Sequence, residues 1–97
     1  MTTHLTPTIS CIVPVYNSAR FIGEALDSIL NQQHSVSQIV VVDDGSTDDL
    51  DAALSNYDQR ISVIRQENRG PAAARNRGIQ ESNGEFLTFL DADDLWR

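Results

Sequence analysis

Two short acidic segments contain the residues best suited to bind a metal ion or a nucleotide. They hold eight of the fourteen acidic residues: Asp43, Asp44, Asp48, Asp49 and Asp51, and then Asp91, Asp93 and Asp94. Asp91 and Asp93 are two residues apart, so in an extended segment their carboxylates point the same way and can share one divalent cation. Mg²⁺ or Mn²⁺ favours such oxygen ligands and could bridge to a diphosphate leaving group. The alternative is that these aspartates only cap a following helix.

The segment Asp43-Asp44-Gly45-Ser46 carries carboxylates that could bind a nucleoside rather than a metal ion. A carboxylate there can accept a hydrogen bond from the ring N–H of a pyrimidine or from ribose hydroxyls. Gly45 permits a tight turn. An ordinary turn, with Ser46 or Thr47 capping the next helix, is an alternative explanation. The two roles are compatible because they use different residues.

The segment Asn68-Arg69-Gly70-Pro71 opens a predicted helix whose N-terminal N–H groups could face phosphate. Arg75 and Arg77 lie farther along that helix, and the arginine fork suits phosphate. Because they are two residues apart they face different ways, so at most one reaches a ligand, and we favour Arg75. The alternative is that both are surface charges.

The segment Pro14-Val15-Tyr16-Asn17 ends an apolar run. Its aromatic ring could pack near a base, and its backbone could hydrogen bond to that base. Taken alone, a tyrosine at this position is more often a packing residue at a strand end. His4 and His34 have no partner at a suitable spacing and receive no role.

A regular alternation of strands and helices positions these clusters. Apolar, β-branched runs predict strands at 9–15, 38–42, 61–64 and 85–90. Helical periodicity predicts helices at 21–30 after a cap at Ser18, at 50–57, and from 71 to a stop at 83–84. This order predicts a doubly wound parallel α/β sheet, which binds ligands outside the carboxyl ends of its strands. Since all four clusters follow strand ends, we expect them to converge at one edge.

Composition narrows the class of protein. A chain of 97 residues with 40% hydrophobic content fits one domain, but a sheet in so short a chain is hard to cover on both faces. The net charge of −7, with arginine as every basic residue, argues against nucleic-acid binding and a polybasic membrane patch. Cys11 lies in an apolar run and is expected to be a buried thiol. Residues 1–7 lack a signal-peptide pattern, which predicts a cytoplasmic location and leaves membrane association of a longer protein open.

Four motifs in this order resemble the N-terminal half of family 2 inverting glycosyltransferases: V-P-V-Y-N, V-V-V-D-D-G-S-T-D, N-R-G-P-A-A-A-R-N-x-G and F-L-D-A-D-D. The resemblance covers residues 8–97 and leaves residues 1–7 as a tail. It implies a truncated Rossmann-like GT-A fold with strand order 3-2-1-4 and helices on both faces. It also implies a nucleotide-diphosphate sugar as donor, a UDP-sugar first, with thymidine and guanosine donors as alternatives.

The same resemblance implies roles for individual residues. Pro14 and Tyr16 would contact the base, and Asn17 belongs to the same binding segment. Asp44 would bind the base ring. The residues expected near the ribose and diphosphate are Asn68, Gly70 and Arg75. Asp91 and Asp93 would meet the ribose and a Mg²⁺ or Mn²⁺ ion, with Asp93 the better metal ligand.

The resemblance implies no general base within this chain. Members of the family continue beyond the acidic motif and supply there the acceptor site and the base that takes the hydroxyl proton. We therefore expect the chain to be the donor-binding part of a glycosyltransferase, inactive alone. The alternative is a non-catalytic nucleotide-binding or interaction module, which would show no acceptor-dependent turnover. A receiver domain is disfavoured because the aspartate pair follows the second strand and the chain has no lysine.

The last predicted strand carries Phe86, Leu87, Phe89 and Leu90 and is expected to be an edge without covering elements. Apolar edges recruit partners. The sequence therefore predicts a homo-oligomer formed through this edge.

Overall fold

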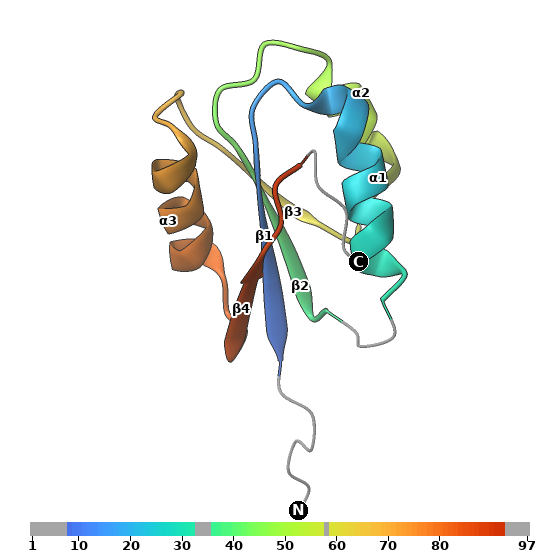
Figure 1. The fold of residues 1–97 in the computed structure, drawn as a ribbon, viewed down its shortest axis with the longest axis vertical. Coiled ribbons are helices and arrows are strands. Elements are labelled where there is room, and N and C mark those ends of the chain that lie inside the picture. The colour runs from blue at the N-terminus through green and yellow to red at the C-terminus, as the bar shows by residue number, and fades with distance from the viewer. Residues whose placement is uncertain (1–7, 33–35, 58, 93–97) are drawn as a thin grey trace, which may run out of the picture.

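The computed structural model describes residues 8–32, 36–57 and 59–92, and its elements alternate as predicted. They are β1 (Ile9–Val15), α1 (Ala19–Leu30), β2 (Gln38–Asp43), α2 (Leu50–Leu54), the 3₁₀ helix η1 (Ser55–Tyr57), β3 (Ser62–Arg65), α3 (Pro71–Glu81) and β4 (Phe86–Phe89). The strands form one parallel sheet in the order β3-β2-β1-β4 (Figure 1). The Rossmann-like α/β fold and its strand order are confirmed.

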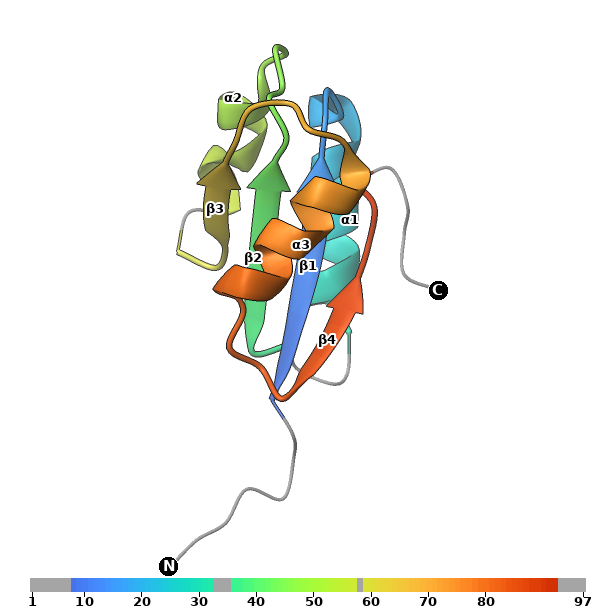
Figure 2. The same ribbon diagram turned by 90° about the vertical axis from the view of Figure 1, so that its left-hand side faces the viewer.

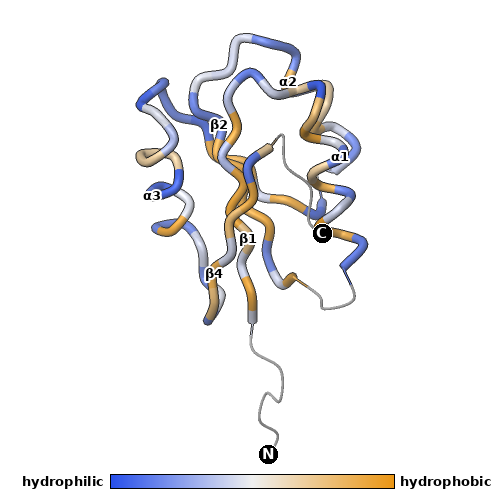
Figure 3. Tube along the Cα trace, in the orientation of Figure 1, coloured by the Kyte–Doolittle hydropathy of each residue, from blue (hydrophilic) through white to orange (hydrophobic). Residues whose placement is uncertain are grey.

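Helices cover both faces of this sheet, with α1 and α2 on one face and α3 on the other (Figures 1 and 2). Alternate residues of β1 enter two separate cores, because successive side chains of a strand point to opposite faces. Cys11 and Val13 belong to the larger core beneath α1 and α2, whereas Ile12 belongs to the smaller core beneath α3. Burial on both faces explains why the central strands read as continuous apolar runs (Figure 3).

Cys11 is fully buried, as the sequence predicts, and burial raises the pKa of its thiol to about 12. Among the described residues, no helix has both the length and the apolar character that crossing a membrane requires.

Helix α3 lies against the sheet more closely than a side chain at Gly78 would permit. A Cβ atom there would be 2.4 Å from Cγ2 of Ile12 and 3.3 Å from Cγ2 of Val42. Ala74, one turn earlier, is also fully buried. The small residues of α3 therefore set the distance between this helix and the sheet.

A hydrogen-bonded group at the amino end of the sheet fixes the connection from α3 to β4. The buried Ser10 hydroxyl donates to Oε1 of Gln38 at 2.8 Å and accepts from the Gly84 N–H at 2.9 Å. The Asn83 N–H also donates to Gln38 Oε1, at 3.0 Å. A Cβ at Gly84 would lie 2.6 Å from the Ser10 nitrogen, so the close approach requires glycine.

Of the predicted helix caps, Ser18 takes the N-cap position of α1, whereas Ser46 and Thr47 do not cap α2. Helix α2 begins at Leu50 rather than after Ser46 or Thr47, and its final turn is the 3₁₀ helix η1. Ser18 stands before α1, but its hydroxyl donates to the Tyr16 carbonyl at 3.1 Å instead of capping the helix. Ser46 and Thr47 bond to Asn17 instead, and the first N–H of α1 donates to Asp48.

Strand β4 lies at the edge of the sheet, and three of the four apolar residues predicted to be exposed there are exposed. Phe86, Leu87 and Phe89 are 58%, 39% and 42% exposed, because α3 lies over β1 and β2. Leu90 is only 6% exposed and belongs to the larger core, so its predicted place on the open edge is wrong. Self-association through β4 stays a prediction.

Replacing Gly78 by alanine should destabilise the fold. The added methyl group would collide with Ile12, and overpacking of this kind costs about 1–3 kcal/mol, against about 1 kcal/mol of gained helix propensity. Urea unfolding would measure the change. The control is Asn76→Ala, on an exposed position of the same helix, which should cause no loss. A Gly78→Ala chain as stable as the original would contradict the close packing.

The exposed aromatic side chains of β4 should drive self-association. We expect light scattering to detect dimers or larger species at high protein concentration, and Phe86→Lys to shift them to monomer, because a charge on an edge strand opposes pairing. The control is Phe21→Lys, since Phe21 is 42% exposed but lies on α1. Observation of monomer alone at high concentration of the unmodified chain would contradict this prediction.

Candidate functional site

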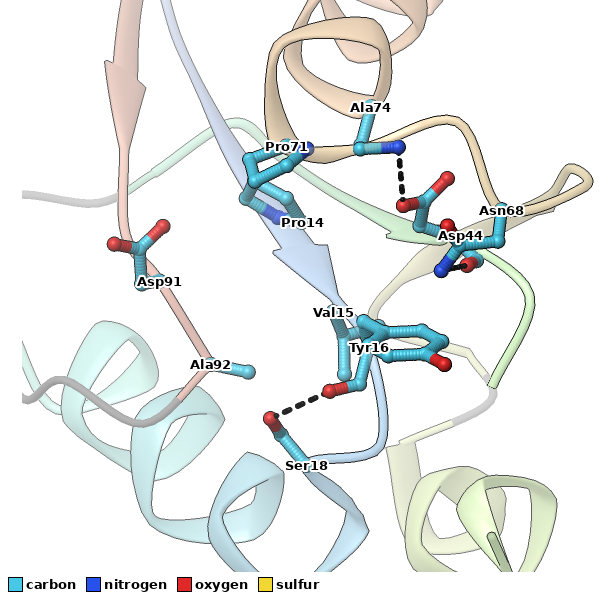
Figure 4. A pocket seen from close by; sticks show the side chains of 11 residues that line it. Pro14, Val15, Tyr16, Ser18, Asp44, Asn68, Pro71, Ala74, Asp91 and Ala92 are labelled. Carbon is cyan, nitrogen blue, oxygen red and sulfur yellow. Dashed lines mark hydrogen bonds between the residues drawn. The ribbon is translucent and has the colours of Figure 1, made fainter. Parts of the chain in front are cut away.

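The predicted polar clusters meet around a cavity of about 320 Å³ at the carboxyl end of the sheet (Figure 4). Its described lining residues are Pro14, Val15, Tyr16, Ser18, Asp44, Asn68, Gly70, Pro71, Ala74, Asp91 and Ala92. Strand β1 pairs with β2 on one side and β4 on the other, and the strand order reverses there, which opens a crevice beyond its end. The predicted convergence of clusters from four strand ends is confirmed.

Asp44, just beyond the end of β2, is a buried carboxylate, 3% exposed, held by the loop before α3. Its Oδ1 accepts from the Arg69 N–H and from Nε2 of Gln66, both at 2.8 Å. Its Oδ2 accepts from the Gly70 N–H at 2.9 Å. The Asn68 side-chain amide donates to the Asp44 carbonyl at 3.1 Å (Figure 4). These bonds join the end of β2 to the start of α3.

One acceptor position of the Asp44 carboxylate has no donor among the described protein groups. An ionised carboxylate has about four lone-pair positions, two on each oxygen. The described protein groups fill two on Oδ1 and one on Oδ2. Burial by itself raises the pKa of Asp44, but the hydrogen bonds from Gln66, Arg69 and Gly70 outweigh it and the net shift is downward. Asp44 is therefore an ionised acceptor at neutral pH.

Two glycines let the loops around Asp44 meet. Gly70 has φ of 99° directly before α3, and Gly45 has φ of 82° directly after Asp44. Both angles favour glycine. A Cβ at Gly45 would also lie 2.8 Å from the Asn68 nitrogen, so a larger residue would push the two loops apart. The turn predicted at Gly45 is confirmed.

The end of β1 forms another wall of the cavity. Pro14 and Tyr16 line it, and Tyr16 is 51% exposed. Asn17 is not among the lining residues, although the sequence groups it with them. Its Oδ1 accepts from the Thr47 N–H at 2.8 Å and its N–H donates to Ser46 Oγ at 3.0 Å, so Asn17 ties β1 to the loop after β2.

Asp91 lies across the cavity from Asp44 (Figure 4). Its carboxylate is half exposed, and Nη2 of Arg75 is 3.7 Å from its Oδ1. Arg77 instead forms an ion pair with Glu81 at 3.5 Å, so the two arginines face different ways, as predicted. Arg75 reaches the rim through Asp91 and is not itself among the lining residues.

The structure describes only one of the two predicted metal ligands. Among the described residues there is no cluster of three or more side chains of the metal-ligating types. Asp91 supplies one open carboxylate, and Asp93 lies outside the described residues. A single carboxylate can contribute to binding a hard divalent cation, since Mg²⁺ and Mn²⁺ can complete their coordination with phosphate oxygens and water.

Two residues with clear structural roles were missed from the sequence. Gln66 directly follows β3, a place that should have signalled a group at the carboxyl edge. Asp48 accepts the Ala19 N–H at 2.9 Å and so caps α1 from another loop.

Asp43 is turned away from the cavity, since its Oδ1 accepts the Ser46 N–H at 2.8 Å and its Oδ2 is 3.7 Å from Arg65 Nε.

Comparison with known proteins agrees with this geometry. The family model described as glycosyl transferase family 2 matches residues 10–97. An uncharacterized glycosyltransferase, RC0461 of Rickettsia conorii, is 47% identical over 90 residues, which are 91% of this chain and 15% of that protein.

Two solved structures are also similar. The mannosyltransferase PcManGT from Pyrobaculum calidifontis, in complex with GDP-Man and Mn²⁺, matches with a TM-score of 0.85 and 35% identity over 93% of this chain and 28% of its own. TarS 1–349 of S. aureus, in complex with UDP-GlcNAc, matches with a TM-score of 0.83 and 36% identity over 91% of this chain and 27% of its own.

The chain thus spans less than a third of each of these three proteins. The matched region contains all four strands of the sheet and the loops that form the cavity. By the extent of this match, the chain belongs to glycosyl transferase family 2.

Proposed function

We propose that this chain binds the nucleoside diphosphate part of a sugar donor in the cavity at the carboxyl edge of the sheet. It would do so as part of an enzyme that transfers the sugar to an acceptor hydroxyl with inversion. The observation that carries the proposal is the Asp44 carboxylate, which is buried, ionised and left with one acceptor position at the cavity wall.

An acceptor of this kind discriminates among bases. The ring edges of uracil, thymine and guanine each present an N–H group, which can donate to Asp44. Cytosine and adenine present a ring nitrogen that accepts, so each would face the carboxylate with an unpaired lone pair. A UDP-sugar is the first candidate, with dTDP- and GDP-sugars next. The complexes of TarS with UDP-GlcNAc and of PcManGT with GDP-Man support this choice of bases.

The start of α3, together with Arg75 and Asp91, suits the diphosphate. Gly70 and Pro71 bring the N-terminus of α3 to the cavity, and a helix N-terminus favours negative charge. Arg75 lies one turn into that helix, beside Asp91. Arg75 would donate to a phosphate oxygen, and Asp91 would bind the ribose or a divalent cation.

We propose that Asp91, whose carboxylate is half exposed at the cavity, would hold a Mg²⁺ or Mn²⁺ ion together with Asp93, which lies outside the described residues. Such an ion, when bound, supplies positive charge that stabilises the departing diphosphate. The chain's own contribution is to orient the diphosphate between Asp91, Arg75 and α3. The presence of Mn²⁺ in the PcManGT complex supports this proposal.

Transfer requires a general base that takes the proton of the acceptor hydroxyl. The described carboxylates that line the cavity have other roles in this proposal, because Asp44 would bind the nucleobase and Asp91 the ribose or a cation. We assign neither as that base. The 97 residues should therefore bind donor without transferring sugar, and added acceptor should not speed nucleotide release.

Asp44→Asn should weaken binding of UDP by roughly ten-fold or more, because the asparagine amide loses a charge-assisted hydrogen bond to the base. Calorimetric titration would measure this, with CDP as a second ligand that should bind the unmodified chain more weakly than UDP. Asp49→Asn makes the same change on an exposed residue and should leave UDP affinity unchanged. Equal affinity of the unmodified chain for UDP and CDP would contradict base recognition by Asp44.

Asp91→Asn should remove most of the gain in UDP affinity that Mn²⁺ provides, because a carboxylate binds a hard cation far better than an amide does. Titrations of UDP with and without Mn²⁺ would measure that gain. The control is Asp49→Asn on an exposed residue that does not line the cavity, which should keep the full gain from Mn²⁺. An unchanged Mn²⁺ effect in Asp91→Asn would separate Asp91 from the metal.

A further inference from the structure

Gln66 contacts Asp44 but does not line the cavity. Its Nε2 donates to Asp44 Oδ1 at 2.8 Å, and its backbone N–H donates to the Asp43 carbonyl at 2.9 Å. Gln66 borders two surface hollows outside the cavity and is not among the residues that line the cavity. Its side chain therefore acts on a bound ligand through Asp44 rather than by contact.

The amide of Gln66 decides which oxygen of Asp44 stays free. The N–H groups of Arg69 and Gly70 fill one acceptor position on each oxygen, and both are backbone groups that any residue would supply. On their own they would leave one open position on Oδ1 and another on Oδ2. Gln66 fills the open position on Oδ1, so the remaining one is on Oδ2.

Gln66 is also a neutral donor. An arginine or lysine in its place would offset the carboxylate charge, and a glutamate would add a second acceptor beside it. An amide holds the carboxylate while leaving its full charge for the ligand. The charged residues that line the two hollows together with Gln66 are Asp43, Asp48, Asp49, Asp51, Arg65, Glu67, Arg69 and Arg77.

We propose that Gln66 is a positioning residue for base recognition, which orients the Asp44 carboxylate and restricts the acceptor offered to the base to Oδ2. This inference rests on the proposed nucleotide binding and assigns part of its specificity to a residue that does not touch the nucleotide.

The test compares Gln66→Met, which keeps the length of the side chain but removes its donor, with the unmodified chain. Calorimetry would measure binding of UDP and, separately, of inorganic pyrophosphate, both in Mn²⁺. We expect UDP affinity to fall roughly three- to ten-fold. Affinity for pyrophosphate, which has no base, should stay the same. The control is Gln80→Met on the exposed face of α3, which should alter neither affinity.

Gln66→Glu provides a second measurement that a merely structural role would not affect. At pH 8 two carboxylates would face each other, and UDP affinity should fall further than in Gln66→Met. At pH 5.5 the pair should hold one proton, and a protonated carboxyl can donate to Asp44 Oδ1. Part of the lost UDP affinity should then return. Circular dichroism at both pH values would confirm that the variant is folded.

The outcomes separate this inference from the proposed function. Failure of the unmodified chain to bind UDP, GDP or dTDP would end the proposed function and the role of Gln66 with it. Normal UDP binding by Gln66→Met, or an equal loss of UDP and pyrophosphate binding, would overturn the role of Gln66 alone. Selective loss of UDP binding, with partial return at low pH in Gln66→Glu, would establish it.

Discussion

The buried carboxylate of Asp44 is the constraint on which the site depends. A charge withdrawn from water must be compensated by hydrogen bonds, and here the loop before α3 supplies them through Arg69, Gly70 and Gln66. That loop can donate in this way because Gly70 adopts a positive φ and Gly45 allows it to come close. The carboxylate and the loop therefore hold each other in place, and together they form one wall of the cavity.

The parallel sheet places Asp44 at one side of the cavity and different polar groups at the other side. Because β1 lies between β2 and β4, the residues that follow these strands face one another across its end. Asp44 offers an acceptor on one side, and Asp91 with Arg75 offers charged groups on the other (Figure 4). The close packing at Gly78 holds α3 against the sheet, which brings both the N-terminus of α3 and Arg75 to the rim.

Most of the stabilising contacts lie away from the site, although the core residues Val15, Ala74 and Ala92 also line the cavity. The two apolar cores lie beneath the helices, and the hydrogen bonds of Ser10, Gln38 and Gly84 lie at the amino end of the sheet. The loops at the carboxyl end therefore hold polar residues that the cores do not require. Strand β4 is the least covered part of the sheet, since its aromatic side chains are exposed while Leu90 just beyond it is buried.

The sequence by itself determined the order of the elements, the strand boundaries to within one residue and the convergence of the polar clusters. It could do so because apolar periodicity is local and parallel strands end at one edge. Only the tertiary structure decided the partners of individual polar groups. The side chain of Asp48 rather than that of Ser18 caps α1, Asn17 binds the loop after β2, and Gln66 holds Asp44. Each of these bonds joins residues at least 22 positions apart, whose meeting depends on the path of the whole sheet and leaves no periodic signal.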